Sequence, residues 1–154
     1  LASEEACERL DLQPEAWLRS WALTAHDPAL GVLMGPASAL PRALDRAGLT
    51  LDDLDLVDFH EAFAGQVLAN LRALASDDFA RKRLGRDTAV GEIDDDKLNV
   101  NGGSVALGHP FGATGARIVG QSVAELRRRG GRYAAVAICA GGTRGAALVL
   151  ERAA

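Results

Sequence analysis

The last third of the chain restricts the fold most strongly, because a long amphipathic helix there leads directly into an apolar strand. Apolar and small residues recur at helical spacing from Ile118 to Leu126. Three arginines follow, which suit the negative end of the helix dipole, and the helix is expected to end at Gly130. The continuous apolar run RYAAVAIC (132–139) then predicts a buried strand, and AALVLE (146–151) predicts its antiparallel partner after a short turn.

Earlier segments alternate between the same two kinds of element. The patterns predict strands at 16–25 and 56–59, a helix over 62–75, and the end of a helix over 3–10. They also predict a loop in DPALGVLMGP (27–36), followed by a helix of about ten residues that carries Leu40 and Ala47 on its apolar face. This order indicates an α/β layered domain, with a mixed, mostly parallel five-stranded sheet and helices on both faces.

The chain has the size of one domain, and one segment departs from its regular pattern. Residues 1–154 are enough for a single hydrophobic core. Segment 76–98 is highly charged with little periodicity, so it is expected to be a surface excursion with at most one helical turn. Three consecutive aspartates at 94–96 are interpreted as part of a solvated loop rather than a cation site, because no EF-hand spacing follows them.

Composition excludes several classes of protein. The chain is 48% hydrophobic and 25% charged with a net charge of -4, which indicates a folded domain and argues against nucleic-acid binding. No apolar stretch approaches the roughly 20 residues that a membrane span needs. The two cysteines, Cys7 and Cys139, are far apart and no secretory signal is present, so a reducing, cytoplasmic location without a disulfide is expected.

Three residues with catalytic chemistry lie where α/β sheets place their reactive groups, just beyond strand ends. His60 follows the strand at 56–59, and Cys139 ends the strand at 132–139. His109 lies in a loop that precedes the long helix and contains Gly108, Gly112 and Gly115. Glycines allow a ligand to approach the backbone, and free N–H groups at a helix start can stabilise an anion.

Other interpretations of these residues remain open at this point. A cysteine at a strand end is usually a small buried hydrophobe, and a histidine in a loop is usually solvated. The glycine spacing matches neither the dinucleotide fingerprint nor a phosphate loop. A zinc site formed by His60, His109 and Cys139 is disfavoured because no closely spaced pair of ligands anchors it.

Three motifs in order make the chain resemble the thiolase family, in the C-terminal half. They are HEAFAGQVLAN (60–70), NVNGGSVALGHPFGATGAR (99–117) and CAGGTRG (139–145), and the stretch leading up to His60 is also similar. The resemblance implies a thiolase-type fold and acyl transfer on CoA thioesters. A histidine at position 60, the excursion at 76–98 and the HPFGATG motif are similar to the trifunctional-enzyme β-subunit, in the fatty-acid-oxidation branch, whereas most thiolases have asparagine at that position.

The resemblance also assigns roles to individual residues. His109 matches the histidine that takes a proton from a nucleophilic cysteine and then helps to hold the thioester oxygen, and Cys139 matches the cysteine that moves a proton at the substrate α-carbon. His60 matches a residue that binds the thioester oxygen, and Gly141 matches a glycine whose N–H completes an oxyanion hole. The remaining expected contacts are with substrate: Ala62 and Phe63 match positions that line the acyl and pantetheine pocket, and Gly108 flanks the catalytic histidine.

One departure from the family pattern limits what this chain is expected to do alone. Nothing matches the acylated cysteine of thiolases, which lies in their N-terminal half, and Cys7 has no matching motif around it. The chain also begins without methionine, as if it continued from a preceding segment. We therefore expect an N-terminal catalytic half outside this chain, and no turnover of acetoacetyl-CoA by the chain itself.

The resemblance leaves three functions open. The first is a 3-ketoacyl-CoA thiolase of fatty-acid β-oxidation, with CoA as co-substrate and neither a permanently bound cofactor nor a metal. The others are a biosynthetic acetoacetyl-CoA thiolase and a non-catalytic module that binds lipid or a partner chain. The resemblance further implies a homodimer or homotetramer, and a hydratase/dehydrogenase subunit as a possible partner.

Overall fold

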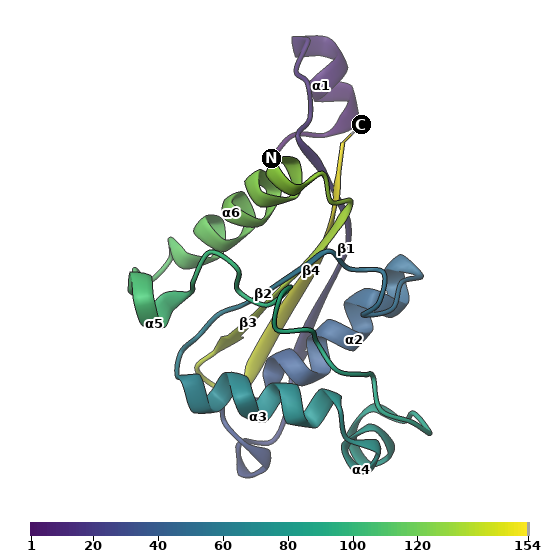
Figure 1. Ribbon diagram of the computed structural model, residues 1–154, viewed down its shortest axis with the longest axis vertical. Coiled ribbons are helices and arrows are strands. Elements are labelled where there is room, and N and C mark those ends of the chain that lie inside the picture. The colour runs from purple at the N-terminus through teal and green to yellow at the C-terminus, as the bar shows by residue number, and fades with distance from the viewer. Residues whose placement is uncertain (154) are drawn as a thin grey trace.

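Four strands form one sheet in the computed structural model, which describes residues 1–153 apart from the side chain of Leu30. Their order across the sheet is β1 (Ala16–Ala25), β4 (Arg144–Arg152), β3 (Tyr133–Ala140) and β2 (Leu56–Phe59). Two long helices cover it, with α2 (Gly35–Ala47) on one face and α6 (Thr114–Arg129) on the other (Figure 1). The predicted α/β layered class, with helices on both faces, is confirmed.

The prediction of five strands in a mostly parallel sheet is wrong in its details. Within the described residues the sheet has four strands, and only β2 and β3 run parallel. Strand β4 is antiparallel to both β3 and β1. For β3 the reason is local, because the turn between β3 and β4 is too short for a parallel crossover. Beyond β2, a fifth position is reduced to a single parallel bridge between Val57 and Leu98. The chain turns away at Asn99, whose φ of 45° ends the extended conformation.

Side chains alternate between the two faces of the sheet and fill two cores. Strand residues with even numbers in β2 and β3 point toward α6, and those with odd numbers point toward α2. Toward α2 the core contains Val57, Phe59, Ala135 and Ala137, together with Leu40 and Leu44 of the helix. Toward α6 it contains Leu56, Ala134, Val136, Leu150, Ile118 and Leu126.

Helix α2 begins earlier than the sequence predicts. The segment expected to be a loop continues into the helix at Gly35, and Pro41 lies in the helix interior. A proline there removes one backbone hydrogen bond, but Pro41 is buried against the sheet and the packing compensates. The first turn is possible only because Gly35 and Gly145 of β4 meet backbone to backbone, with no room for a Cβ atom on either residue.

The other predicted helices are present. Helix α1 (Glu4–Leu10) is capped by the Ser3 hydroxyl, which accepts from the Ala6 N–H at 3.2 Å. Helix α3 (Ala64–Leu74) follows β2 closely, and the short helix α5 (Ser104–Leu107) lies before the loop that leads into α6.

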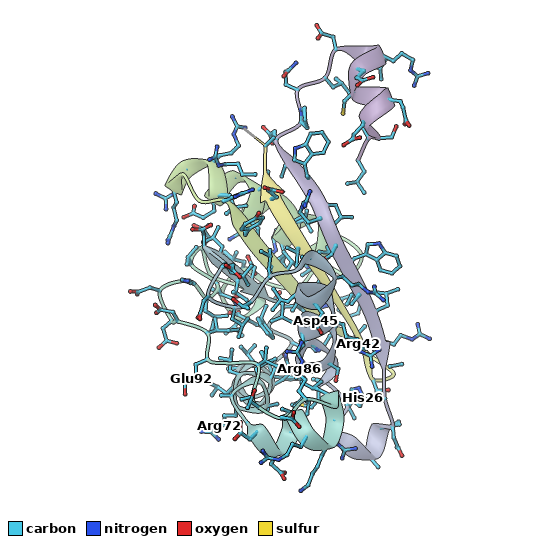
Figure 2. All side chains as sticks on the ribbon, turned by 90° about the vertical axis from the view of Figure 1, so that its right-hand side faces the viewer. His26, Arg42, Asp45, Arg72, Arg86 and Glu92 are labelled. Atoms are coloured by element: carbon cyan, nitrogen blue, oxygen red, sulfur yellow. The ribbon has the colours of Figure 1, made fainter. Side chains whose placement is uncertain are left out.

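Segment 76–98 is more closely attached to the core than an excursion would be. It begins with α4 (Asp77–Phe79) and a π-helical turn over Ala80–Leu84, and its charged side chains are mostly exposed. Arg86 pairs with Asp45 of α2, and Figure 2 shows the two side chains on the same side of the molecule. Val90, Ile93 and Leu98 pack against the core on the α2 side. The hydrophobic residues of this segment therefore fix its path.

Candidate active site

His60 is held at the end of β2 by backbone pairing that continues past the strand. Its N–H donates to the carbonyl of Ala137 at 2.9 Å, so His60 lies beside β3, two residues before Cys139. The His60 side chain is 2% exposed, and its Nδ1 lies 3.1 Å from the Ser104 hydroxyl. Burial is the main cause that lowers the pKa of His60, and nearby His109 and Arg117 lower it further, against the opposing effect of Glu61. These effects favour a neutral imidazole at neutral pH.

Cys139 lies near the end of β3, directly before the turn into β4. The thiol is free and buried, and burial raises its pKa, while a hydrogen bond from the Ala62 backbone has a smaller, opposing effect. The thiol form therefore predominates at neutral pH. The turn after Cys139 requires positive φ values at Gly142 (78°) and Thr143 (62°), and it leaves Gly141 with nothing within 4 Å of where a Cβ would be.

His109 lies in the loop before α6 and is held by the first residue of that helix. Its Nδ1 lies 2.7 Å from the Thr114 hydroxyl, which in turn lies 3.2 Å from the carbonyl oxygen of Pro110. Thr114 is only 2% exposed, so this anchor is fixed by the packing of the helix. The backbone reaches this position through Gly108, whose φ of 88° favours glycine.

The two imidazole rings are in contact and line one pocket. The ring centroids of His60 and His109 are 4.2 Å apart with a 41° tilt, and the ring centroid of Phe111 lies 4.8 Å from that of His109. The pocket has a volume of about 840 Å³, and Cys139 lines it together with both histidines. Three residues that are remote in the sequence therefore converge at one rim of the sheet.

The remaining predicted site residues divide into two groups. Ala62, Phe63 and Gly141 line the same pocket, whereas Gly108 is not among its lining residues and contributes only the turn before His109. Part of the wall is apolar and open to solvent: Phe63 is 66% exposed, Val105 66% and Phe111 88%. Other lining residues are Leu33, Glu61, Ser104, Gly112, Thr114, Gly115, Ile138 and Ala140.

The polar residues that support the two histidines were not predicted from the sequence. Ser104 contacts His60, Thr114 contacts His109, and Arg117 donates from Nη2 to the Ser104 hydroxyl at 3.2 Å. Thr114 could have been found from its place five residues after His109, at the start of the predicted helix. Ser104 carries no such signal, because a serine after two glycines is equally typical of a helix cap.

A family model described as "Thiolase, C-terminal domain" matches residues 12–152. The chain belongs to this family. The predicted resemblance is thus confirmed, and this thiolase C-terminal domain includes every residue that lines the pocket.

Individual relatives agree with this assignment. The chain is 56% identical over 151 residues to "3-ketoacyl-CoA thiolase" of Escherichia coli. This match covers 98% of the chain and 35% of the relative. The crystal structure of human mitochondrial 3-ketoacyl-CoA thiolase superposes with a TM-score of 0.80 at 40% identity, over 99% of this chain and 34% of the human chain. The crystal structure of the human protein in complex with CoA gives a TM-score of 0.78 at 39% identity. The chain spans about a third of the length of these relatives.

The thiolase C-terminal domain uses one carboxylate to attach the α5 region to the end of β2. Glu61 accepts from Asn99 Nδ2 at 2.6 Å and from the Val105 N–H at 2.9 Å. The Asn99 side chain also pairs with the backbone of Phe59, as a neighbouring strand would. Gly103 leaves room for the Glu61 carboxylate, because a Cβ atom there would collide with it. The loop that carries Ser104 is therefore fixed relative to His60.

Residues 1–153, which the structure describes, hold neither a candidate metal cluster nor a membrane-spanning helix. Within this range no group of three or more His, Cys, Asp or Glu side chains is placed to hold a metal ion. Within the same range, no helix is both long and apolar enough to cross a bilayer.

Proposed function

We propose that this chain forms the C-terminal part of a 3-ketoacyl-CoA thiolase that cleaves 3-ketoacyl-CoA with CoA to acyl-CoA and acetyl-CoA in fatty-acid β-oxidation. The observation that carries this proposal is the convergence of His60, His109 and Cys139 on one pocket with apolar walls. The name of the E. coli relative supports it, as does the crystal structure of the human relative in complex with CoA. CoA is then a co-substrate, and the reaction needs no resident cofactor.

The reaction needs a nucleophile that we assign to a cysteine outside this chain. A thiolate attacks the C3 carbonyl of the substrate, the C2–C3 bond breaks, and an acetyl-CoA enolate leaves an acyl group on the cysteine. CoA thiolate then takes the acyl group and frees the cysteine. Two oxyanions form during these steps, at the ketone and at the acetyl-CoA thioester, so the site needs hydrogen-bond donors for both.

His109 is assigned as the base that takes the proton of the nucleophilic thiol. The Thr114 hydroxyl can donate to the carbonyl oxygen of Pro110, which leaves its lone pairs to accept from His109 Nδ1–H. The other ring nitrogen, Nε2, then carries a lone pair and can accept a proton. Thr114 thus prepares His109 for general-base chemistry, and a histidine beside a thiol promotes formation of the thiolate.

Cys139 is assigned as the proton donor to C2 of the departing enolate. Its raised pKa keeps the proton on sulfur at neutral pH, where it is available for transfer to carbon. In the second half of the reaction, the resulting thiolate can take the proton of the incoming CoA thiol. This exchange returns Cys139 to its starting state, so protons balance over one turnover.

The remaining residues are assigned to binding. His60 and the Gly141 N–H stabilise developing oxyanions, Ala62 and Phe63 form the wall for acyl and pantetheine groups, and Gly108 lets the backbone turn next to His109. An N-terminal thiolase half is the required partner. We also propose a cytoplasmic homodimer or homotetramer that can associate with a hydratase/dehydrogenase subunit.

A chimera tests the proposal directly. Because the E. coli relative is 56% identical to this chain, its C-terminal third can be replaced by this chain. The chimera should thiolyse acetoacetyl-CoA, whereas the 154-residue chain alone should show no turnover. Cys139→Ala should lower kcat by roughly 100-fold or more, and Cys7→Ser, which changes a cysteine remote from the pocket, should leave it unchanged.

The acyl-enzyme separates the alternatives. Cys139→Ala should still be acylated at the upstream cysteine by 3-ketoacyl-CoA or acyl-CoA, as intact-protein mass spectrometry can detect. A folded chimera without turnover, or one in which Cys139→Ala retains full activity, would refute the assignment and support a non-catalytic module. The biosynthetic alternative uses the same groups. It would be favoured if the chimera accepted acetoacetyl-CoA but none of the 3-ketoacyl-CoA substrates with longer acyl chains.

A further inference from the structure

A chain of hydrogen bonds behind the pocket links Arg117 to His60 through Ser104. Arg117 Nη2 donates to Ser104 Oγ at 3.2 Å, and Ser104 Oγ lies 3.1 Å from His60 Nδ1. Ser104 is 7% exposed and His60 is 2% exposed, so bulk water competes little for these bonds. The chain joins three separate elements: α6, the start of α5 and the end of β2.

The direction of the protons follows from the chemistry of the three groups. A guanidinium can only donate, so Arg117 uses a lone pair of Ser104 Oγ. Among the hydrogen bonds of residues 1–153, the acceptor left for the Ser104 hydroxyl proton is His60 Nδ1. A neutral imidazole that accepts at Nδ1 carries its proton on Nε2. Thr114 favours the opposite tautomer in His109, which faces His60 at 4.2 Å.

The charge of Arg117 lies at an unfavourable position near the start of α6. Arg117 is the fourth residue of α6, where a cation opposes the helix dipole, whereas the other three arginines of α6 lie in its last turn. Its Nη1 donates to Gln121 Oε1 at 3.1 Å, one turn along the helix, which orients the guanidinium. The buried carboxyl of Asp58, on the face of β2 toward α6, interacts electrostatically with it.

We propose that Arg117 is a positioning residue which, through Ser104, holds His60 as the neutral tautomer with its N–H on Nε2. That N–H is then available to donate to a substrate oxygen in the pocket, while Nε2 of His109 is free to accept a proton. Two neighbouring imidazoles thereby divide the tasks of hydrogen-bond donor and base. The use of this N–H on a thioester oxygen rests on the proposed function, but the tautomer itself does not.

The tautomer can be measured without any turnover. The chain has three histidines, His26, His60 and His109, so ¹⁵N-histidine labelling and long-range ¹H–¹⁵N spectra at neutral pH resolve the ring nitrogens of each. In the wild-type chain, His60 should have a protonated Nε2 and an unprotonated Nδ1. Arg117→Gln and Ser104→Ala should each make the Nδ1–H form of His60 appear. In both variants no Ser104 hydroxyl proton is directed to Nδ1, so Nδ1 is no longer held as an acceptor.

A matched control and a second readout make the test specific. Ser122→Ala removes a buried hydroxyl of α6 that has no hydrogen-bond partner among the described residues, and it should leave the His60 signals unchanged. In the chimera, Arg117→Gln should lower kcat about 10-fold with little change in KM, since Arg117 does not line the pocket. If Arg117→Gln fails to fold, Ser104→Ala tests the same proton.

The proposal is overturned if wild-type His60 carries its proton on Nδ1, or if both variants keep the Nε2–H form. A chimera without thiolase activity would refute the proposed function, yet the NMR result would still decide the tautomer. The two ideas can therefore fail separately.

Discussion

Replacement of Asp58 by asparagine should stabilise the protein at neutral pH and have little effect at pH 4. Asp58 is 7% exposed, and its Oδ1 has no hydrogen-bond partner among the described residues. Burial raises the pKa of Asp58 to about 7, and nearby Glu61 adds to the increase, whereas Arg117 opposes it. The folded protein therefore keeps the Asp58 carboxyl protonated at pH values at which the unfolded chain ionises it.

The pH dependence follows from the difference between the two states. Between pH 4 and pH 7 the unfolded chain releases the Asp58 proton and the folded protein retains it, so a rising pH favours unfolding. An ordinary aspartate pKa near 3.9 and a folded pKa of about 7 give a loss of about 0.5 kcal/mol at pH 4 and about 4 kcal/mol at pH 7.5. Asparagine has nearly the same shape and cannot ionise, so Asp58→Asn should recover most of this difference.

Urea denaturation followed by tryptophan fluorescence measures the effect, because both tryptophans, Trp17 and Trp21, lie on β1. The free energy of unfolding of Asp58→Asn minus that of wild type should grow between pH 4 and pH 7.5. Asp52→Asn, at an exposed aspartate in the turn before β2, should show no such growth. A constant difference across this range, or a destabilised Asp58→Asn at neutral pH, would mean that the carboxylate is ionised and paired with Arg117, and would refute the reasoning.

Two further predictions concern packing and charge. Gly35→Ala should destabilise the protein by about 2 kcal/mol in urea denaturation, because the new Cβ would lie 2.5 Å from the Arg144 carbonyl oxygen. The control Gly120→Ala, at an exposed and open position of α6, should be neutral or stabilising. Glu125→Gln should lower the free energy of unfolding by about 1 kcal/mol at pH 7, because Glu125 pairs with two arginines of α6. Those hydrogen bonds lower the pKa of Glu125 to about 2, so the difference should be complete above its usual pKa and disappear as the pH falls toward 2.

Local patterns were sufficient to predict most elements and to bring three candidate site residues to one edge of the sheet. The strand that ends at Cys139 and the helix that ends at Gly130 follow from runs and periodicities within a few residues. His60, His109 and Cys139 could be grouped because each lies at a strand end or before a helix, and α/β sheets collect such positions at one edge. The positions of these three side chains around one pocket agree with that argument.

The features that could not be predicted depend on contacts between distant parts of the chain. The hydrogen bond between His60 and Ser104 spans 44 residues, and neither residue type at those positions indicates the other. The interior position of Pro41 depends on burial against the sheet, which outweighs the local preference of proline for helix starts. The antiparallel pairing of β1 with β4 likewise joins the two ends of the chain, so no local pattern determines it.

The hydrogen bonds of Glu61 to Asn99 and Val105 separate the pocket from the charged segment 76–98. After α3 the chain runs through segment 76–98 and returns to the sheet at Asn99. Side-chain and backbone hydrogen bonds attach it there to the end of β2, before the chain continues to Ser104. The return point is set by hydrogen bonds to β2 and not by the charged side chains of the segment. Those exposed charged residues can therefore change without altering the wall behind the two imidazoles, whereas Val90, Ile93 and Leu98 are held by the core.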